Sequence, residues 1–255
     1  MSSLSLRNVR KSYPGNVEVL KGINIEIEAG QFLILVGGSG CGKSTLLNMI
    51  AGLDTVSSGE IYIGERLVNH LSPKERDIAM VFQSYALYPS MTVRENIAFG
   101  LGIRKVAKDA QQRTVKRVSE MLQIDHLLDR KPGQLSGGQR QRFSIAAALV
   151  HGPKVFFLDE PTTGLDPQAR RNLWNMIKKI RDRGVSVIMT THYMDEAEIL
   201  CDRIAVMDGG KIVALDTPKN LIKALLKRGF KKAQHVEQAN LEDVFIDLTG
   251  KAHRD

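Results

Sequence analysis

Residues 37–44 have the sequence Gly-Gly-Ser-Gly-Cys-Gly-Lys-Ser, which matches the pattern G-x-x-x-x-G-K-[ST]. Glycines at this spacing let successive backbone N–H groups curl around a phosphate, and the N-terminus of a following helix adds positive potential. Lys43 would reach the outer phosphates, and the Ser44 hydroxyl would ligate Mg²⁺. An ordinary glycine-rich turn is the alternative, and the buried strand before the loop and the helix after it count against that. The candidate ligand-binding residues are Gly37, Ser39, Gly40, Cys41, Gly42, Lys43, Ser44 and Thr45.

Two acidic residues end a second apolar stretch. Residues 155–158 are apolar and are followed by Asp159 and Glu160. In a parallel sheet, ligands bind beyond the carboxyl ends of the strands, so we expect this end to lie beside the glycine-rich loop. Adjacent strand residues point to different sides, so Asp159 would serve Mg²⁺ while Glu160 acts as a base toward an attacking water. The alternative is a solvated junction between strand and loop, where acids are common.

The segment Ser-Gly-Gly-Gln at residues 136–139, here called the signature turn, opens a predicted helix that runs to about Val150. Ser136 and Gln139 fit a capping box, so a well-capped helix is the simplest interpretation. Glycine weakens a helix, however, and Gly137 and Gly138 occupy its first two positions. We interpret them as allowing an anion to approach the exposed N–H groups closely. The turn would then be a second phosphate-binding helix start.

The elements that must position these residues alternate between strands and helices. Strands are predicted at residues 4–9, 17–28, 32–36, 61–63, 78–82, 155–158, 185–189, 204–207 and 211–215. Helices are predicted from Lys43 to Gly52, after Asp166-Pro167, near Met194 and after Thr217-Pro218. From residue 92 to residue 150 the pattern is helical throughout. Such alternation argues for a mainly parallel sheet that is covered on both faces.

The predicted fold class is therefore α/β. It is a P-loop NTPase with a mainly parallel sheet core, an antiparallel β subdomain and an inserted α-helical subdomain. We expect residues 1–83 and 153–226 to form the nucleotide-binding core, with the antiparallel strands at its N-terminal end. Residues 84–152 would form the helical insertion that carries the signature turn. Residues 227–255 would be a short polar tail with one amphipathic piece at 241–248.

Composition narrows the class of partner. The net charge of the 255-residue chain is +8, but its Lys and Arg residues are spread along the chain. The densest patches, at residues 178–183 and 227–232, are short and contain a single aromatic residue, Phe230, where a stacking platform interleaves several, so no nucleic-acid partner is expected. Cys41 and Cys201 are the two cysteines, which fits a reducing compartment. The apolar runs fall short of the roughly 18 residues of a membrane span, and the N-terminus lacks a signal-peptide pattern.

The signature turn, the glycine-rich loop and the Val-Phe-Phe-Leu-Asp-Glu segment at 155–160 together resemble the ATP-binding cassette (ABC) family over nearly the whole chain. The resemblance implies that Tyr13 stacks on adenine and that Gln83 contacts the metal. It also implies that Asp166 lies in a loop crossing a dimer interface and that His192 contacts the γ-phosphate. On the residues alone, Tyr13 is equally a turn aromatic, Asp166 an N-cap, and His192 a histidine satisfied by its neighbours.

The resemblance also implies a mechanism with ATP and Mg²⁺ as cofactors. Two copies of the chain would face each other, and the signature turn of one copy would close over the γ-phosphate held by the other. Membrane-spanning permease subunits would be the further partners, with the protein on the cytoplasmic face of the membrane. Residues 83–88 would form the hinge toward them. The catalytic residues would be Lys43, Gln83, Glu160 and His192, and the metal ligands Ser44, Gln83 and Asp159.

Different parts of the sequence indicate different transport directions. The front half resembles ATPases of sugar importers, whereas the back half resembles ATPases of drug and polysaccharide exporters. Sugar-importer ATPases usually carry a further β-rich C-terminal domain, for which this chain is too short. An exporter subunit with an importer-like front half, a hybrid and an engineered chain are the three explanations. The interpretation that we favour is a hybrid joined near residues 142–156, and substrate and direction stay open.

Two other classes remain as alternatives. Cassette ATPases that act on nucleic acid or ribosomes carry long coiled-coil insertions or two cassettes in one chain, and this sequence has neither. A GTPase or a small-molecule kinase would leave the signature turn unexplained, and no guanine-specific NKxD pattern is present. Within the loop, the Cys41 thiol either fills space or has a pKa lowered by the helix N-terminus. In the second case we expect its alkylation to impair ATP binding.

Overall fold

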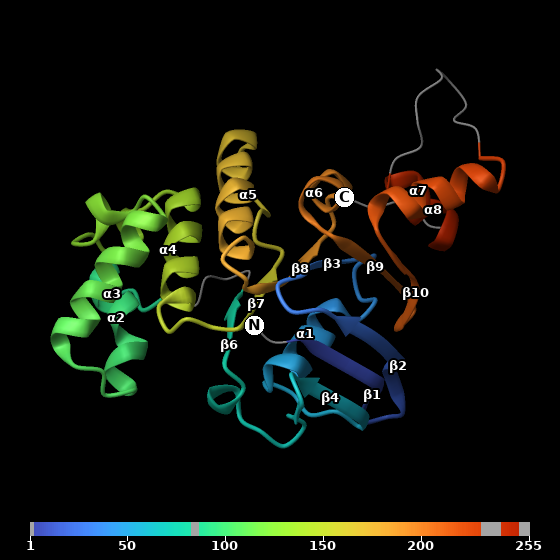
Figure 1. Cartoon of the computed structure of the whole chain (residues 1–255), viewed down its shortest axis with the longest axis horizontal. Helices are drawn as coiled ribbons and strands as arrows, with labels where there is room; N and C mark the ends of the chain where they lie inside the picture. The colour runs from blue at the N-terminus through green and yellow to red at the C-terminus, as the bar shows by residue number, and fades with distance from the viewer. Residues whose placement is uncertain (1–2, 83–86, 231–240, 250–255) are drawn as a thin grey trace.

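The larger of two sheets runs through the middle of the molecule, in a computed structural model that describes residues 3–82, 87–230 and 241–249 (Figure 1). Its strand order is β10-β9-β3-β8-β7-β6. The strands are β3 (Phe32–Val36), β6 (Ile78–Val81), β7 (Val155–Asp159), β8 (Ser186–Thr191), β9 (Arg203–Asp208) and β10 (Lys211–Asp216). All neighbours pair in parallel except β10, which joins β9 antiparallel. The predicted mainly parallel core is confirmed.

The second sheet is antiparallel, with strand order β2-β1-β4-β5. Its strands are β1 (Leu4–Tyr13), β2 (Val17–Ile27), β4 (Ser58–Ile63) and β5 (Arg66–Leu67). Ile23, Ile25 and Ile27 of β2 are buried while Asn24 and Glu26 are exposed. This period of two is what one buried face requires, and it is the pattern from which the strand was predicted.

Strand β3 is buried on both faces, which explains its continuous apolar sequence. Phe32 and Ile34 join the apolar cluster that includes helices α5 (Pro167–Arg181) and α6 (Met194–Leu200). Leu33 and Leu35 join the opposite cluster, with helix α1 (Lys43–Ala51) and the antiparallel sheet. Helix α1 therefore lies between the two sheets, and its N-terminus emerges at the carboxyl end of β3 (Figure 1).

Three helices follow one another between β6 and β7 and lie to one side of the sheets (Figure 1). They are α2 (Val93–Ile103), α3 (Lys108–Met121) and α4 (Gly137–Leu149), and between residues 87 and 152 the structure has no strand. Short 3-10 turns are η1 (Pro73–Glu75), η2 (Asp125–Leu127) and η3 (Pro132–Gln134). The inserted helical region is confirmed, while its proposed boundaries stay predictions because residues 83–86 lie outside the described residues.

Some strand limits differ from the predicted ones. Strand β1 continues past Val9 to Tyr13, because a pairing irregularity at Asn8, whose φ is 48°, interrupts the alternation without ending the strand. Strand β8 runs two residues beyond Met189, through two buried threonines that give no apolar signal. Strand β5 was not predicted, since two residues show no period.

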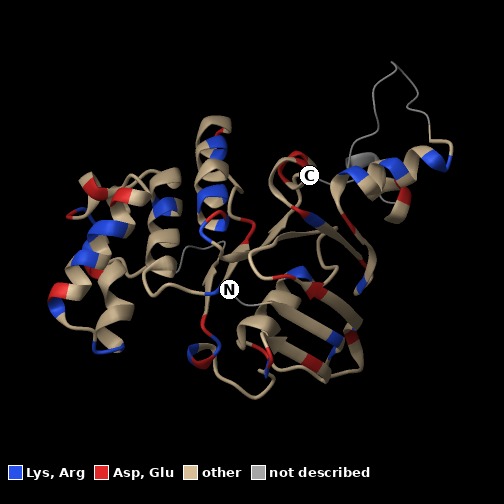
Figure 2. Cartoon of the chain, in the orientation of Figure 1, with Lys and Arg blue, Asp and Glu red and all other residues tan. Residues whose placement is uncertain are grey.

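The C-terminal region adds helices α7 (Pro218–Lys227) and α8 (Leu241–Thr249), which contact each other. Val244 and Phe245 of α8 are buried, so the amphipathic piece expected in a polar tail packs onto the domain. Figure 2 shows Lys and Arg on α3, α5 and α7 and on strands of both sheets. Within the described residues no helix is both long enough and apolar enough to cross a bilayer.

A buried arginine covers the C-terminal end of α1. Arg76 is 4% exposed and donates through Nη1 to the carbonyl oxygens of Met49, at 2.7 Å, and Ile50, at 2.8 Å. Its Nε donates to the Leu71 carbonyl at 2.9 Å. The last turn of α1 contains no basic residue, so Arg76 supplies the positive charge that the helix dipole favours there. Burial lowers the pKa of this guanidinium.

Candidate functional site

The glycine-rich loop connects β3 to α1 and folds around the side chain of its own lysine. Lys43 is only 7% exposed, and its Nζ donates to the carbonyl oxygens of Gly37, at 2.7 Å, and Gly38, at 3.2 Å. Gly42 is the N-cap of α1 with φ 105°, a backbone conformation that favours glycine. Ser39, Gly40 and Ser44 are exposed and Thr45 is half-buried. The loop therefore presents its backbone and the first turn of α1 outward while the lysine charge sits at its centre.

Cys41 does not have the lowered pKa that its place at a helix N-terminus suggested. Its side chain is buried, with 7% exposed, and burial raises the pKa of the thiol. The Lys43 ammonium, 3.9 Å from Sγ, opposes this effect without overcoming it. Of the two interpretations of Cys41, the geometry therefore favours the one in which the thiol fills space.

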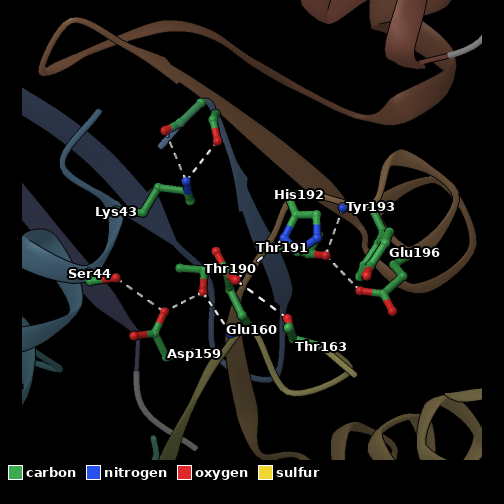
Figure 3. A network of polar contacts seen from close by, with 12 residues as sticks. Lys43, Ser44, Asp159, Glu160, Thr163, Thr190, Thr191, His192, Tyr193 and Glu196 are labelled. Carbon is green, nitrogen blue, oxygen red and sulfur yellow. Dashed lines mark hydrogen bonds and ion pairs between the residues drawn. The ribbon is translucent and has the colours of Figure 1, made fainter. Parts of the chain in front are cut away.

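The carboxylate of Asp159 lies where three elements meet. Asp159 is the last residue of β7, and its Oδ1 accepts from Thr190 Oγ1 of β8 at 2.6 Å and from Ser44 Oγ of α1 at 3.4 Å (Figure 3). Carboxylate and hydroxyl oxygens are the hard ligands that Mg²⁺ accepts. Among the described residues no three His, Cys, Asp or Glu side chains gather as a metal site. The pair therefore fits Mg²⁺ in its common protein setting, where one or two protein oxygens act together with substrate phosphates.

Glu160 follows with a left-handed backbone, at φ 46°. Its backbone N–H donates to Thr190, reaching the carbonyl oxygen at 3.2 Å and Oγ1 at 2.9 Å, so β8 holds this strained position in place. Thr163 Oγ1 donates to Glu160 Oε2 at 3.4 Å. The same Oε2 lies 3.4 Å from His192 Nδ1 (Figure 3). The geometry thus brings together the two residues that the sequence nominated as base and γ-phosphate contact.

Tyr13 lies at the end of β1 and is 39% exposed. Its hydroxyl donates to Asp54 Oδ2 at 2.7 Å, and the Lys11 Nζ lies 4.9 Å from the ring centroid. Lys11 in turn binds Asp54 Oδ1 at 2.5 Å. The hydrogen bond to Asp54 raises the pKa of the phenol. The ring is therefore held in one orientation and remains accessible, as an aromatic platform for a base must be.

The signature turn starts α4 at the surface, apart from the residues described so far. Ser136 is exposed and caps the helix: the Gln139 N–H donates to Ser136 Oγ at 3.3 Å, and the Ser136 N–H donates to Gln139 Oε1 at 2.9 Å. The capping-box interpretation of these two side chains is thus present in the structure. A methyl group added at Gly137 would meet no atom within 4 Å, and one at Gly138 would lie 3.4 Å from the Ala169 Cβ.

A hollow separates the starts of α4 and α5. Its walls include the signature turn together with Gly164 and Asp166. Asp166 is the N-cap of α5, where its Oδ1 accepts from the Ala169 N–H at 2.8 Å. The N-cap interpretation of Asp166 is therefore present in the structure, and its place in a loop that crosses a dimer interface stays a prediction.

The remaining predicted residue, Gln83, lies outside the described residues, as do residues 84–86 of the proposed hinge. Tyr88, at the end of that hinge, is described: its N–H donates to Asn96 Oδ1 at 2.9 Å, and its ring packs on Phe99 at 4.7 Å between centroids. Sequence reasoning missed Thr190, which supports both acids. Its signal was the pair of threonines before His192, polar residues at the end of an otherwise apolar strand.

Comparison with known proteins identifies the same family that the sequence motifs resemble. The sequence profile of the family described as ABC transporter matches residues 20–163, more than half of the chain. The sn-glycerol-3-phosphate import ATP-binding protein UgpC of Brucella abortus is 51% identical over 222 residues, 87% of this chain and 63% of that protein. The sulfoquinovosyl glycerol transport ATP-binding protein SmoE of Agrobacterium fabrum is 50% identical over 219 residues, 86% of this chain and 61% of its own. The chain thus spans about three fifths of the length of these curated relatives.

Solved structures agree with the fold. A dimeric post-hydrolysis state of the ATP-binding cassette MJ0796 bound to ADP and Pi has a TM-score of 0.76 at 32% identity, covering 84% of this chain and 98% of that one. CbiO1 from Clostridium perfringens, part of the ABC transporter complex cbiONQ, has a TM-score of 0.80 at 32% identity, covering 88% and 94%.

These matches bear on the suggested junction at residues 142–156. The 222-residue match to UgpC is too long to avoid that region in a chain of 255 residues, so one relative accounts for sequence on both sides of it. The importer–exporter hybrid gains no support from the comparisons. The glycine-rich loop, the strand-end acids and the signature turn occur together in the fold of an ABC cassette P-loop NTPase, and the chain belongs to the ABC transporter family.

Proposed function

We propose that this chain hydrolyses ATP as the motor subunit of a membrane transporter and works as a dimer with ATP between two copies. The observation that carries the proposal lies at the carboxyl ends of the parallel strands β3, β8 and β7, within a cassette fold. There Ser44, next to Lys43 in the glycine-rich loop, contacts Asp159, and Glu160 follows directly in the chain. In open α/β sheets this edge is where ligands bind. The relatives named above are ATP-binding proteins of transport systems, which supports the same assignment.

The chemistry proposed for one copy follows from the contacts. The loop N–H groups and the Lys43 ammonium bind the triphosphate, and Tyr13 stacks on the base. Asp159, Ser44 and Gln83 would hold Mg²⁺, which when bound neutralises charge on the phosphates. Glu160, with Oε2 facing His192, accepts the proton of the attacking water, and His192 lies on the γ-phosphate side.

The partner copy would complete this site. Ser136 is exposed at the start of α4, and the surroundings of Gly137 are open, so the helix N-terminus can approach a phosphate held by another molecule. Asp166 lies beside it on the same hollow. The similar cassette MJ0796 has been solved as a dimer, which supports this arrangement. ATP would join the two copies, and hydrolysis would release them.

For direction and cargo, the named relatives favour import. UgpC is named for import of sn-glycerol-3-phosphate and SmoE for transport of sulfoquinovosyl glycerol. We therefore assign this chain to an importer of small, polar glycerol-derived solutes. It would act on the cytoplasmic face of the membrane, with the helices α2–α4 and residues 83–88 passing the motion to permease subunits.

The test uses Glu160→Gln in the full chain. With ATP and Mg²⁺ we expect phosphate release to fall by about 10²–10⁴-fold and a stable dimer to accumulate, measured by light scattering after size exclusion. Lys43→Ala is the matched control, because it should lose ATP binding and stay monomeric. Brisk hydrolysis by Glu160→Gln would refute Glu160 as the base, and a monomer that binds ATP would refute the dimer.

A further inference from the structure

Glu196 in α6 is a fully buried acid that the proposed chemistry does not use. Its side chain is 0% exposed, and burial raises the pKa of its carboxyl. Burying an ionisable group is costly unless hydrogen bonds compensate, so its contacts indicate what it does.

The carboxylate of Glu196 links two separate elements. Its Oε2 accepts from Thr191 Oγ1, at the end of β8, at 2.7 Å. Its Oε1 accepts from Trp174 Nε1 of α5 at 3.1 Å and lies 3.9 Å from Arg170 Nε. Thr191 Oγ1 also accepts from the Tyr193 N–H at 3.0 Å. Glu196 is thus connected to the residue before His192 directly and to the residue after it through one hydroxyl (Figure 3).

Side-chain alternation at the end of β8 places Thr190 and Thr191 on different sides, and His192 follows the strand directly. Thr190 points to the acids, where its hydroxyl contacts Asp159 at 2.6 Å. Thr191 points to the other side, toward Glu196, and His192 turns back so that its Nδ1 lies 3.4 Å from Glu160 Oε2. Glu196 therefore reaches the site through the backbone that carries His192 and touches none of the acids itself.

We propose that Glu196 is a positioning residue for ATP hydrolysis, holding residues 191–193 so that the His192 ring faces Glu160. The inference rests on the proposed ATPase function. The carboxylate is the acceptor for both Thr191 and Trp174, and an amide in its place leaves one of these donors facing an N–H₂ group. The loop around Lys43 follows β3 and is held by the bonds from Lys43 to its own carbonyl oxygens, so the defect appears in turnover and leaves ATP affinity intact.

The kinetic test compares Glu196→Gln with Glu198→Gln, an exposed acid on the same helix. We expect Glu196→Gln to lower kcat by about 10–100-fold with KM unchanged, because small misplacements of a reacting group have effects of this size. Glu198→Gln should match the wild type. The double variant His192→Ala/Glu196→Gln should be no slower than His192→Ala, since Glu196 acts through His192. Wild-type turnover by Glu196→Gln, or additive losses in the double variant, would overturn the proposal.

A second measurement is independent of hydrolysis. The ring protons of His192, observed by NMR in the intact chain, should shift in Glu196→Gln and not in Glu198→Gln. If Glu196→Gln fails to fold, Thr191→Val removes the same hydrogen bond without changing charge and should give the same shift. Unchanged resonances in the folded variant would overturn the positioning role. A wild-type chain that releases no phosphate would instead refute the proposed function, and the NMR result would still decide the role of Glu196.

Discussion

The two glycine-containing helix starts, at α1 and at α4, differ in what surrounds their glycines. A Cβ at Gly37 would lie 2.4 Å from the Met207 carbonyl oxygen, and one at Gly42 would lie 2.6 Å from Leu20 Cδ2. At Gly137 an added Cβ meets nothing within 4 Å. The fold itself therefore requires glycine at positions 37 and 42 of the glycine-rich loop. In the signature turn, any requirement must come from something the helix start meets outside its own chain.

The polar side chains of the two starts show the same contrast. Lys43 is buried and donates to a carbonyl oxygen of its own loop, so contacts within the chain hold the start of α1. Ser136 is exposed, and within the described part of the chain its side chain bonds only inside its capping box. The start of α1, held by its own lysine next to the strand-end acids, suits a ligand site formed within one chain. The exposed start of α4 suits contact with a second molecule.

Gly42→Ala should give the largest effect on stability. Alanine at φ 105° is strained by about 1–3 kcal/mol, so the free energy of unfolding in urea should fall by that amount. ATP binding should be lost as well, because Gly42 leads directly into Lys43. The matched control is Gly38→Ala in the same loop, where an added Cβ has open space and stability should stay at the wild-type level. Equal stability of the two variants would contradict the packing argument.

Gly137→Ala should reverse that pattern. Alanine is better than glycine in a helix by up to about 1 kcal/mol, so the isolated chain should be as stable as the wild type or slightly more so. Phosphate release by the single variant should decrease, and so should the amount of ATP-dependent dimer when the change is combined with Glu160→Gln. The reason is that the methyl group occupies the space in front of the helix N–H groups. Gly133→Ala, which also has open space, serves as the control for activity. A variant with full activity would remove the case for an external ligand at this turn.

Alkylation of Cys41 should give the smallest effect. Burial raises the pKa of its thiol, so the reactive thiolate is scarce at neutral pH and labelling by iodoacetamide should be slower than in urea-unfolded chain. Cys201, where burial raises the pKa to about 12, provides an internal comparison in the same mass-spectrometric measurement. Once modified, Cys41 should impair ATP binding, because Sγ lies 3.9 Å from Lys43 Nζ. Full affinity after complete modification would contradict this.

The sequence predicted the elements with strong periodicity or clear end signals. The buried β3, the alternating β2 and the helix from Lys43 to Gly52 carry their own pattern, and each appears as expected. The limits of β1 and β8 did not, because a bulge at Asn8 and the threonines at the end of β8 break the apolar period while strand pairing continues. Where a strand ends depends on its pairing with the neighbouring strand. The sequence of one segment carries no information about that pairing.

The candidate site divides in a similar way. The acids and Lys43 could be brought together from the rule that ligands bind at the carboxyl ends of parallel strands. The residues that hold the site residues in place could not be predicted. Asp54, which bonds the Tyr13 hydroxyl, is distant in the sequence, and Glu196, which bonds Thr191 next to His192, stands in no recognisable motif. The sequence left two interpretations of Cys41 open, and burial of the thiol at 7% exposure favours the space-filling one. Side-chain supports of this kind follow from tertiary contacts.

Arg76 also decides how α1 is connected to the larger sheet. Its guanidinium donates to two of the last carbonyl oxygens of the nine-residue helix α1, which ties the rear end of that helix to the chain just before β6. Two residues later the chain enters β6, the strand that leads toward the helical insertion. Helix α1 therefore connects the lysine of the glycine-rich loop, at its front end, to the start of β6, at its rear end. Under the proposed function, this connection joins the triphosphate site to the strand that precedes the helical insertion.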